Sequence, residues 1–283
     1  MLIGLVHKYV RSRFRRMGAV SRFLDLDSCR LHYFEYEHPD PRGTVLLVHG
    51  LGTSASTWLK ILPTLISEHH VIAVDLPGFG FSSLKPGTSF YTLSEHCTAL
   101  SALVERTVHD RLTLIGHSFG GWISVRLAAA NRGSLLCLVL VDTAGIPYPG
   151  AERLRELFTI DSPAHMRKLL DALWYRYPWY FKPFASAIYH EMTKRNVNGI
   201  VASIGEEDSL VGELSLLTMP VSVVWGREDR VISPAAVQVL KRMVPQASVC
   251  FIDGCGHVPQ LERPAELKKI LSHILMGAGR GLD

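Results

Sequence analysis

The stretch LTLIGHSFGG at residues 112–121 runs from an apolar, mostly β-favouring segment straight into a serine held between glycines. Residues 112–116 predict a buried strand, and the sequence WISVRLAAA that follows the glycines predicts a helix. A chain that turns sharply from strand to helix crowds its turning residue, so small side chains are needed two positions before and after it. Gly116 and Gly120 meet that need around Ser118, in the pattern G-x-S-x-G. We therefore expect the Ser118 hydroxyl to lie exposed at the carboxyl edge of a sheet, placed to attack.

Seven other segments carry the apolar patterns of strands. They are residues 23–27, 31–37, 44–50, 70–76, 135–142, 221–226 and 248–253. The first two alternate apolar and polar residues, whereas most of the later ones are continuously apolar and are separated by segments of helical periodicity. The expected helices cover residues 56–67, 92–108, 120–131, 234–243 and 262–275. This order predicts an α/β fold with a mostly parallel, eight-stranded sheet flanked by helices and an antiparallel edge formed by the early strands.

One interval interrupts this alternation, because residues 146–217 show no strong strand pattern. Within it, residues 174–189 hold eight of the 25 aromatic residues of the chain, which is too many for an ordinary connecting loop. The rings predict either the insertion's own core or an apolar wall over a pocket, and the same residues can serve both purposes. We expect an insertion that acts as a cap, with Trp174 and Trp179 in contact with substrate.

A serine is a poor nucleophile near neutral pH, so Ser118 needs a base and a group that orients the base. The loop that leaves the strand at residues 221–226 begins with Asp229, and the loop after the last strand carries His257. Both positions lie just past the carboxyl ends of strands, where open parallel sheets place ligands. Ser118, Asp229 and His257 thus form one expected catalytic constellation, in the chain order Ser, acid, His.

The sequence resembles the α/β-hydrolase superfamily, in its branch of small serine esterases and lipases with a helical cap. The resemblance covers roughly residues 23–275 and rests on four motifs at suitable spacing, including HGLG at 49–52 and DLPGFGFS at 75–82. It implies that HGLG supplies one of two oxyanion donors. We expect these donors to be the backbone N–H groups of Leu51 and Phe119, which would stabilise charge that appears only in the tetrahedral intermediate.

Four other side chains near these motifs compete for the same roles: Asp142, Glu228, Asp208 and Cys255. Asp142 ends the sixth strand, where some relatives carry the acid, but the Asp229 loop is the better match, and Glu228 and Asp208 are weaker candidates. Cys255 has no basic partner of its own, which favours a small packed side chain over a nucleophile. Asp75, in DLPGFGFS, is interpreted as structural.

The resemblance implies a carboxylic ester hydrolase that needs no cofactor or metal and forms an acyl-enzyme on Ser118. The apolar, aromatic cap favours esters with short to medium acyl chains or monoacylglycerols. The alternative is a carbon–carbon bond hydrolase of the meta-cleavage type, but that branch commonly has Asn at the position of His117, which we expect to contact substrate. A non-catalytic ligand receptor on the same fold is a third reading, and such receptors typically lose a member of the triad.

Charge is concentrated at one end of the chain. Six of the 30 basic residues fall within the first 22 residues, where no acid occurs, which leaves 24 basic against 26 acidic side chains elsewhere. The body therefore carries no excess of positive charge that would favour nucleic acid. The five cysteines are odd in number and have no metal-ligand spacing, so we expect a reducing, cytoplasmic setting.

The basic N-terminal segment has the spacing of an amphipathic helix, with apolar side chains on one side and Lys8, Arg11 and Arg15 on the other. Three readings stay open: packing on its own domain or a dimer mate, peripheral contact with an anionic membrane, and a frayed arm. The expected organisation is an N-terminal helix at residues 1–20, a hydrolase core at 21–145 and 218–283, and a cap at 146–217.

Overall fold

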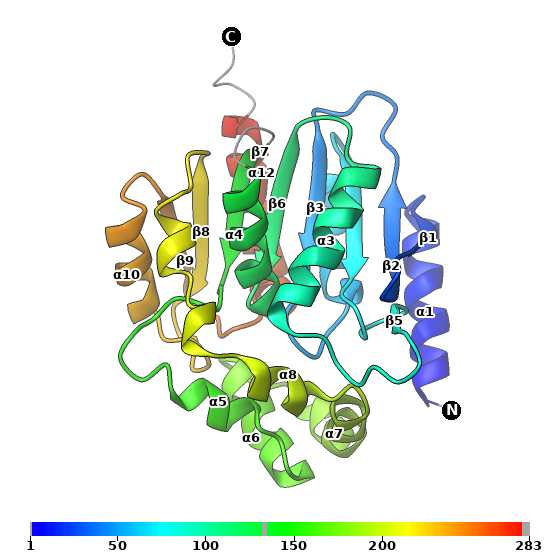
Figure 1. The fold of residues 1–283 in the computed structure, drawn as a ribbon, viewed down its shortest axis with the longest axis vertical. Coiled ribbons are helices and arrows are strands. Elements are labelled where there is room, and N and C mark those ends of the chain that lie inside the picture. Colours follow the sequence, from blue (N-terminus) through cyan, green and yellow to red (C-terminus); the bar gives the residue numbers. More distant parts are fainter. Residues whose placement is uncertain (1, 132–134, 279–283) are drawn as a thin grey trace.

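The centre of the molecule is a mixed sheet built from the apolar strands that the sequence predicts (Figure 1). The computed structural model describes residues 2–131 and 135–278, and within them the sheet has nine strands in the order β1-β2-β4-β3-β6-β7-β8-β9, with β5 paired to β2. The strands are β1 (Val20–Asp25), β2 (Cys29–Tyr36), β3 (Thr44–Val48), β4 (His70–Asp75), β5 (Ser83–Leu84), β6 (Leu112–His117), β7 (Leu135–Val141), β8 (Val221–Gly226) and β9 (Ser248–Ile252).

The predicted fold class is confirmed, with one difference in the strand count. Strands β3, β4, β6, β7, β8 and β9 pair in parallel, and β1, β2 and β5 form the antiparallel edge. The ninth strand, β5, has only two residues, so no periodicity could reveal it. The central strands β3, β6 and β8 are buried along their whole length, because helices cover both faces of the sheet.

The helices of the core lie close to the predicted segments, and prolines set two of their boundaries. They are α1 (Leu2–Arg16), α2 (Leu62–Leu65), α3 (Leu93–Thr107), α4 (Phe119–Ala130), α10 (Ala235–Met243), α11 (Pro259–Glu262) and α12 (Pro264–Ala278). The single helix expected at residues 56–67 is a short 3-10 turn, η1 (Ala55–Trp58), followed by α2, which has a proline in its first turn. Pro264 likewise begins α12 and separates it from α11, since the residue before a proline disfavours helix.

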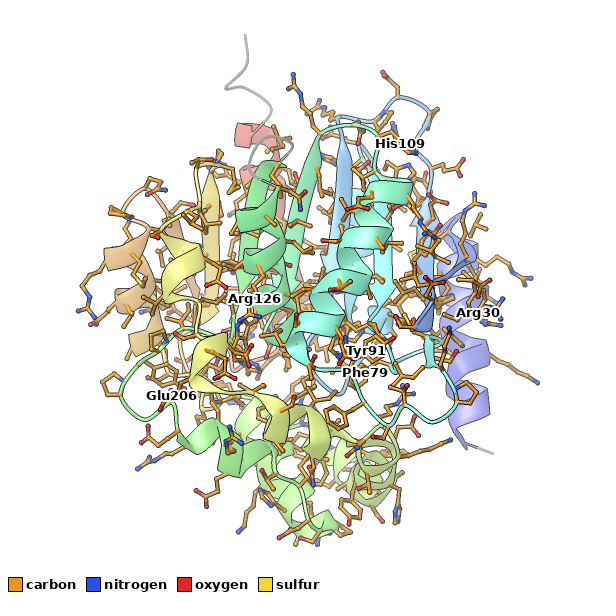
Figure 2. All side chains as sticks on the ribbon, in the orientation of Figure 1. Arg30, Phe79, Tyr91, His109, Arg126 and Glu206 are labelled. Carbon is orange, nitrogen blue, oxygen red and sulfur yellow. The ribbon has the colours of Figure 1, made fainter. Side chains whose placement is uncertain are left out.

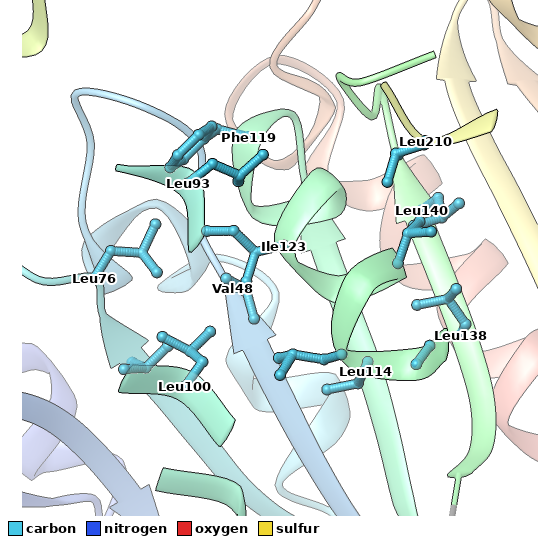
Figure 3. Packing of buried hydrophobic residues seen from close by; sticks show 14 of the residues in the cluster. Val48, Leu76, Leu93, Leu100, Leu114, Phe119, Ile123, Leu138, Leu140 and Leu210 are labelled. Carbon is cyan, nitrogen blue, oxygen red and sulfur yellow. The ribbon is translucent and has the colours of Figure 1, made fainter. Parts of the chain in front are cut away.

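Two apolar layers hold the helices against the sheet. Helices α3, α4 and α10 pack on one face, and α1, α2 and α12 pack on the other. In Figure 3, Leu100 of α3 and Ile123 of α4 lie against Val48 of β3 and Leu114 of β6, and all four side chains are fully buried. Burying each such side chain contributes about 1.5–3 kcal/mol. This layer fixes where α4, and therefore its first residue, stands on the sheet.

The residues between β7 and β8 form short helices beyond one end of the sheet, and we call this segment the cap (Figure 1). Its elements are α5 (Arg153–Phe158), α6 (Pro163–Leu173), η2 (Trp179–Phe184), α7 (Ala185–Lys194), α8 (Val197–Ser203), η3 (Glu206–Asp208) and α9 (Val211–Leu214). Arg126 of α4, which points toward the cap segment containing Glu206 in Figure 2, pairs with Asp208 at 3.1 Å and Glu213 at 3.4 Å. Polar contacts therefore fix the cap to the core on this side.

The second half of helix α1 packs on its own domain. Phe14 is fully buried, and its ring stacks on that of Phe34 with centroids 3.8 Å apart, while Val10 is also buried. Met1 and the side chains of residues 2–7 lie outside the described part, as do residues 279–283 of the expected core. Among the helices described, none combines the length and apolar character needed to cross a bilayer.

Candidate active site

The turn between β6 and α4 holds Ser118 in a backbone conformation that residues other than glycine rarely adopt. Its φ is +53° and its ψ is −118°, a strained combination for any residue other than glycine. A Cβ on Gly120 would come within 2.4 Å of the Val48 carbonyl oxygen, and one on Gly116 within 2.5 Å of the Gly120 carbonyl oxygen. Both glycines are therefore required sterically, because the strand and the helix approach closely on either side of the serine.

The structure brings Ser118, His257 and Asp229 together from the loops after β6, β9 and β8. The Ser118 Oγ lies 2.9 Å from Nε2 of His257, and Nδ1 of His257 lies 2.7 Å from Oδ2 of Asp229. All three residues are buried, with 7% of Ser118 and 1% of His257 exposed. Because Nδ1–H donates to Asp229, Nε2 is left to accept the hydroxyl proton of Ser118.

Both partners of the serine are fixed by backbone groups. The other oxygen of Asp229, Oδ1, accepts hydrogen bonds from the N–H groups of Val231 at 2.8 Å and Ile232 at 3.0 Å. The backbone N–H of His257 donates to the carbonyl of Leu173, the last residue of α6, at 2.8 Å. The imidazole of His257 is thus oriented by a carboxylate with little freedom to move.

The HGLG loop lies directly against the serine elbow. A Cβ on Gly50 would meet Nδ1 of His117 at 2.8 Å and Cβ of Ser118 at 3.2 Å. His49 holds this loop to the one after β4, because its Nδ1–H donates to the Gly50 carbonyl at 2.8 Å and its Nε2 accepts the N–H of Leu76 at 2.9 Å. The conformation of HGLG is therefore set by buried hydrogen bonds rather than by solvent.

Leu51 and Phe119, the expected oxyanion donors, both line the cavity beside Ser118. Within the described residues neither backbone N–H donates a hydrogen bond to another protein group. Two unpaired amides that flank a nucleophile can stabilise an oxyanion without first breaking other bonds.

A cavity of about 670 Å³ opens from Ser118 toward the cap. Its walls are mainly apolar, with Trp122, Ile146, Phe158 and Val201 among them, and it also contacts three charged side chains: Glu152, Arg155 and Glu206. An apolar cavity with a few polar groups suits a small amphiphilic ligand. Trp122 could have been anticipated from its position four residues after Ser118, whereas the place of Phe158 depends on how the cap folds.

The three residues expected to contact substrate lie elsewhere. His117 is buried behind the elbow, where its Nε2–H donates to the backbone carbonyl of His257 at 2.7 Å. Trp174 directly follows α6, and its carbonyl accepts a hydrogen bond from Arg230. Trp179 is 78% exposed on the cap. None of the three is among the described residues that line the cavity.

The competing side chains have structural partners. Glu228 accepts the backbone N–H of Cys255 at 2.9 Å, and Asp208 pairs with Arg126 of α4. Asp75 accepts hydrogen bonds from the N–H groups of Ala55 and Phe81 and from His32. Cys255 is fully buried, which raises the pKa of its thiol and keeps it protonated.

Asp142, the alternative acid, faces the same histidine from the end of β7. A carboxylate oxygen of Asp142, a carboxylate oxygen of Asp229 and a ring nitrogen of His257 all lie within 4.8 Å of one another. Metal ligands have similar spacing, but Nδ1 of His257 and both oxygens of Asp229 are already engaged in hydrogen bonds. The contact with His257 Nδ1 belongs to Asp229, so the geometry favours Asp229 over Asp142 as the orienting acid.

Three buried histidines near the site are neutral. Burial lowers the pKa of His49 to about 4 and those of His96 and His117 to about 3. His96, on α3, packs its ring edge-on against Phe119 with centroids 5.4 Å apart, and neither of its ring nitrogens has a hydrogen-bond partner among the described residues. All three rings are therefore uncharged at neutral pH, and His96 acts as a packing group.

A mostly parallel sheet with a serine elbow at the carboxyl end of a central strand, below a helical insertion, is the architecture of an α/β hydrolase. The model of the alpha/beta hydrolase family matches residues 45–270, so the chain belongs to this family.

Individual relatives indicate which kinds of hydrolase this chain resembles. Lipase 3 of Moraxella sp. (strain TA144) is 32% identical over 232 residues, which cover 77% of this chain and 72% of that protein. The 2-hydroxymuconate semialdehyde hydrolase of Pseudomonas sp. (strain CF600) is 26% identical over 257 residues, covering 83% of this chain and 87% of that protein. A crystal structure of a membrane phospholipase A, described as a novel bacterial virulence factor, has a TM-score of 0.84 and 28% identity, and the match covers 98% of this chain and 93% of that one. The protein is a hydrolase, and its lipase relatives support ester hydrolysis.

The elbow geometry predicts that Gly120→Ala is strongly destabilising. The new methyl group would overlap the backbone oxygens of Val48 and His49, which cannot rotate away, so we expect the free energy of unfolding to fall by about 3 kcal/mol. Urea unfolding measures the change. Gly212→Ala is the matched control, because a Cβ there meets nothing within 4 Å. Equal stability of the two variants would contradict the steric role of Gly120.

The neutral histidines predict that stability falls in acid. The pKa of histidine is near 6.5 in the unfolded chain, whereas that of His96 in the folded protein is about 3. Between these two pH values the unfolded chain therefore binds a proton that folded His96 does not. The free energy of unfolding consequently falls as the pH is lowered through this range. In His96→Leu, the slope of the unfolding free energy against pH below about pH 6 should decrease by up to about 1.4 kcal/mol per pH unit. At pH 7 the variant should be at least as stable as the wild type, since no hydrogen bond is lost.

The measurement is urea unfolding at several pH values between about 7 and 4. The control is the same substitution at His273, which is exposed on α12. An unchanged slope in His96→Leu would show that His96 is not a neutral buried group.

Proposed function

We propose that this protein is a serine hydrolase that cleaves carboxylic esters through an acyl-enzyme on Ser118. The observation that carries the proposal is the buried hydrogen-bonded row of Ser118, His257 and Asp229, which opens into a largely apolar cavity. The lipase names of relatives support the same reaction class. In this proposal Asp229, rather than Asp142, orients the base.

The steps follow from the positions of the proton and the charge. His257 Nε2 takes the hydroxyl proton as Ser118 Oγ bonds to the ester carbonyl carbon, and Asp229 stabilises the resulting imidazolium. The carbonyl oxygen becomes an oxyanion that accepts hydrogen bonds from the N–H groups of Leu51 and Phe119. His257 then gives its proton to the leaving alcohol, which leaves the acyl group on Ser118. Water enters, His257 removes its proton, and the acid is released by the same steps in reverse order, without cofactor or metal.

The cavity points to short to medium acyl chains or monoacylglycerols. Its volume of about 670 Å³ and its apolar wall accommodate a flexible acyl chain beside Ser118. Glu152, Arg155 and Glu206 add hydrogen-bonding groups to the lining, which suit the free hydroxyls of a glycerol ester.

A carbon–carbon bond hydrolase is the second candidate. Its supporting observations are the 2-hydroxymuconate semialdehyde hydrolase relative and the similar fold of a solved meta-cleavage product hydrolase from Pseudomonas fluorescens IP01, which has a TM-score of 0.75. Arg155 in the cavity lining could pair with the carboxylate of such a substrate. Turnover of esters is therefore to be compared with turnover of a diketone acid of the meta-cleavage type.

The triad predicts that Ser118→Ala abolishes ester hydrolysis. Nitrophenyl esters of increasing acyl length are the substrates, and kcat should fall by about 10⁶ if the three residues act as a unit. Ser67→Ala is the matched control. Ser67 is exposed and does not line the cavity, so this substitution should leave turnover unchanged. Full activity of Ser118→Ala would refute the acyl-enzyme, and faster turnover of the diketone acid would favour the second candidate.

We further propose that helix α1 contacts an anionic membrane. Its Lys8, Arg11 and Arg15 side chains are exposed and border a hollow of about 440 Å³ against β1 and β2. Apolar side chains at the same hollow, Val20 and Phe34, give it the mixed character of a lipid headgroup site. The similar membrane phospholipase A supports a membrane setting.

The membrane contact predicts salt-sensitive binding to liposomes that contain anionic lipid. The double reversal Arg11→Glu and Arg15→Glu should weaken binding by about 25-fold or more, because each basic residue near an anionic surface contributes about 1 kcal/mol. The control reverses Arg242 and Lys269, which are exposed on α10 and α12, and so has the same net charge. Equal binding of both variants would rule out α1, and a change in oligomeric state alone would indicate a dimer contact instead.

A further inference from the structure

Asp142 is a buried carboxyl group that the proposed reaction does not use. It directly follows β7 with a φ of +43°, a strained value for a residue with a side chain, and it is fully buried. Its backbone N–H donates to the Val224 carbonyl at 3.0 Å, and its Oδ1 accepts the N–H of Gly226 at 2.8 Å. The two bonds to β8 hold the carboxyl group at one position beside the triad.

The second oxygen of Asp142 has no conventional donor. Across the described residues, Oδ2 is buried and accepts no hydrogen bond, and no lysine or arginine forms an ion pair with this carboxyl group. The titratable groups that face it are Asp229 of the β8 loop and, from the β9 loop, His257 and Cys255. Its principal charged neighbour is therefore another carboxylate.

Two carboxylates buried this close together are not both ionised, because neither charge is screened from the other. The ionised form of Asp229 is the better stabilised of the two, since it accepts hydrogen bonds from two backbone N–H groups and from the Nδ1–H of His257. Asp142 accepts only one N–H. Burial, followed by the negative charge of Asp229, raises the pKa of Asp142 well above its ordinary value.

We propose that Asp142 is neutral during turnover and donates a hydrogen bond from Oδ2–H to the carboxylate of Asp229, which makes it a positioning residue for the base His257. The proposal rests on the triad assigned above. It explains the otherwise unpartnered oxygen, and it gives Asp229 a fourth hydrogen bond that fixes its orientation.

The protonation state of Asp142 matters for the base. An ionised Asp142 would place a second negative charge near His257 and stabilise the imidazolium, so the histidine would remain protonated at higher pH. A neutral, donating Asp142 does the opposite, because it withdraws charge from Asp229. In this proposal Asp142 holds Asp229 in place without adding a second negative charge beside His257.

The test compares Asp142→Asn with Asp142→Ala in the pH profile of kcat/KM for a nitrophenyl ester. Asparagine keeps both an acceptor for Gly226 and a neutral donor toward Asp229, so its activity and the acid limb of its profile should match the wild type. Alanine removes the donor, and Asp229 then stabilises the imidazolium more strongly. We expect kcat to fall about 10-fold with little change in KM, and the acid limb to move to higher pH.

The opposite direction overturns the proposal. If Asp142 were ionised, both substitutions would remove a negative charge, and the acid limb would move to lower pH by about one unit or more. An unmoved acid limb in Asp142→Ala would also overturn it. Asp253→Asn is the matched control, because this carboxylate is exposed beside Arg227 and its charge is screened by solvent.

An infrared measurement tests the proton without substrate. The wild type at neutral pH should show the carbonyl absorption of a protonated carboxyl group, and the difference spectrum against Asp142→Asn should isolate it. No such band would mean that Asp142 is ionised. Because this readout needs no turnover, a failure of the ester assay and a failure of the Asp142 assignment are distinguishable.

Discussion

The backbone strain at Ser118 is the constraint on which the rest of the site depends. A φ of +53° is kept only because the surrounding structure leaves no alternative: Gly120 lies against the end of β3, and the N–H of Ser118 donates to Val141 of β7 at 3.0 Å. The buried layer between α4 and the sheet supplies the stability that opposes this strain. Since the same turn presents Ser118 to the cavity and leaves the N–H of Phe119 unpaired, the proposed nucleophile and one proposed oxyanion donor come from one local geometry.

Sequence reasoning reached the features that local patterns encode. The apolar runs located the eight main strands, and the order of Ser118, Asp229 and His257 followed from loops that leave the carboxyl ends of parallel strands, which necessarily meet at one edge. The same reasoning did not identify the residues of the cavity wall. Trp174 and Trp179 were expected there because the insertion is rich in aromatic residues, but composition cannot tell which face of a cap helix turns toward the core. Phe158 and Val201 line the cavity only because the cap helices pack as they do.

Buried polar groups behind the catalytic edge connect its loops. His49 links the HGLG loop to the loop after β4, and His117 links the serine elbow to the backbone of His257. A lone histidine in a sequence does not reveal such a role, because each contact joins residues far apart in the chain. His117 was expected at the substrate, yet it is not among the described residues that line the cavity. The neutral state of these rings follows from burial, and it keeps added positive charge away from His257.

The cap is joined to the catalytic loops as well as covering them. The carbonyl of Leu173 accepts the N–H of His257, Arg230 donates to the carbonyls of Asp171 and Trp174, and Glu262 accepts the N–H groups of Tyr175 and Arg176. The carboxyl end of α6 is therefore held by the loops that carry Asp229 and His257, so a motion of this segment would disturb the alignment of His257. Helices α5 and α8, which contribute residues to the cavity lining, make no such bonds to the loops of Asp229 and His257 within the described residues. Access for substrate without loss of the triad geometry is consequently expected through displacement of α5 and α8 rather than of α6.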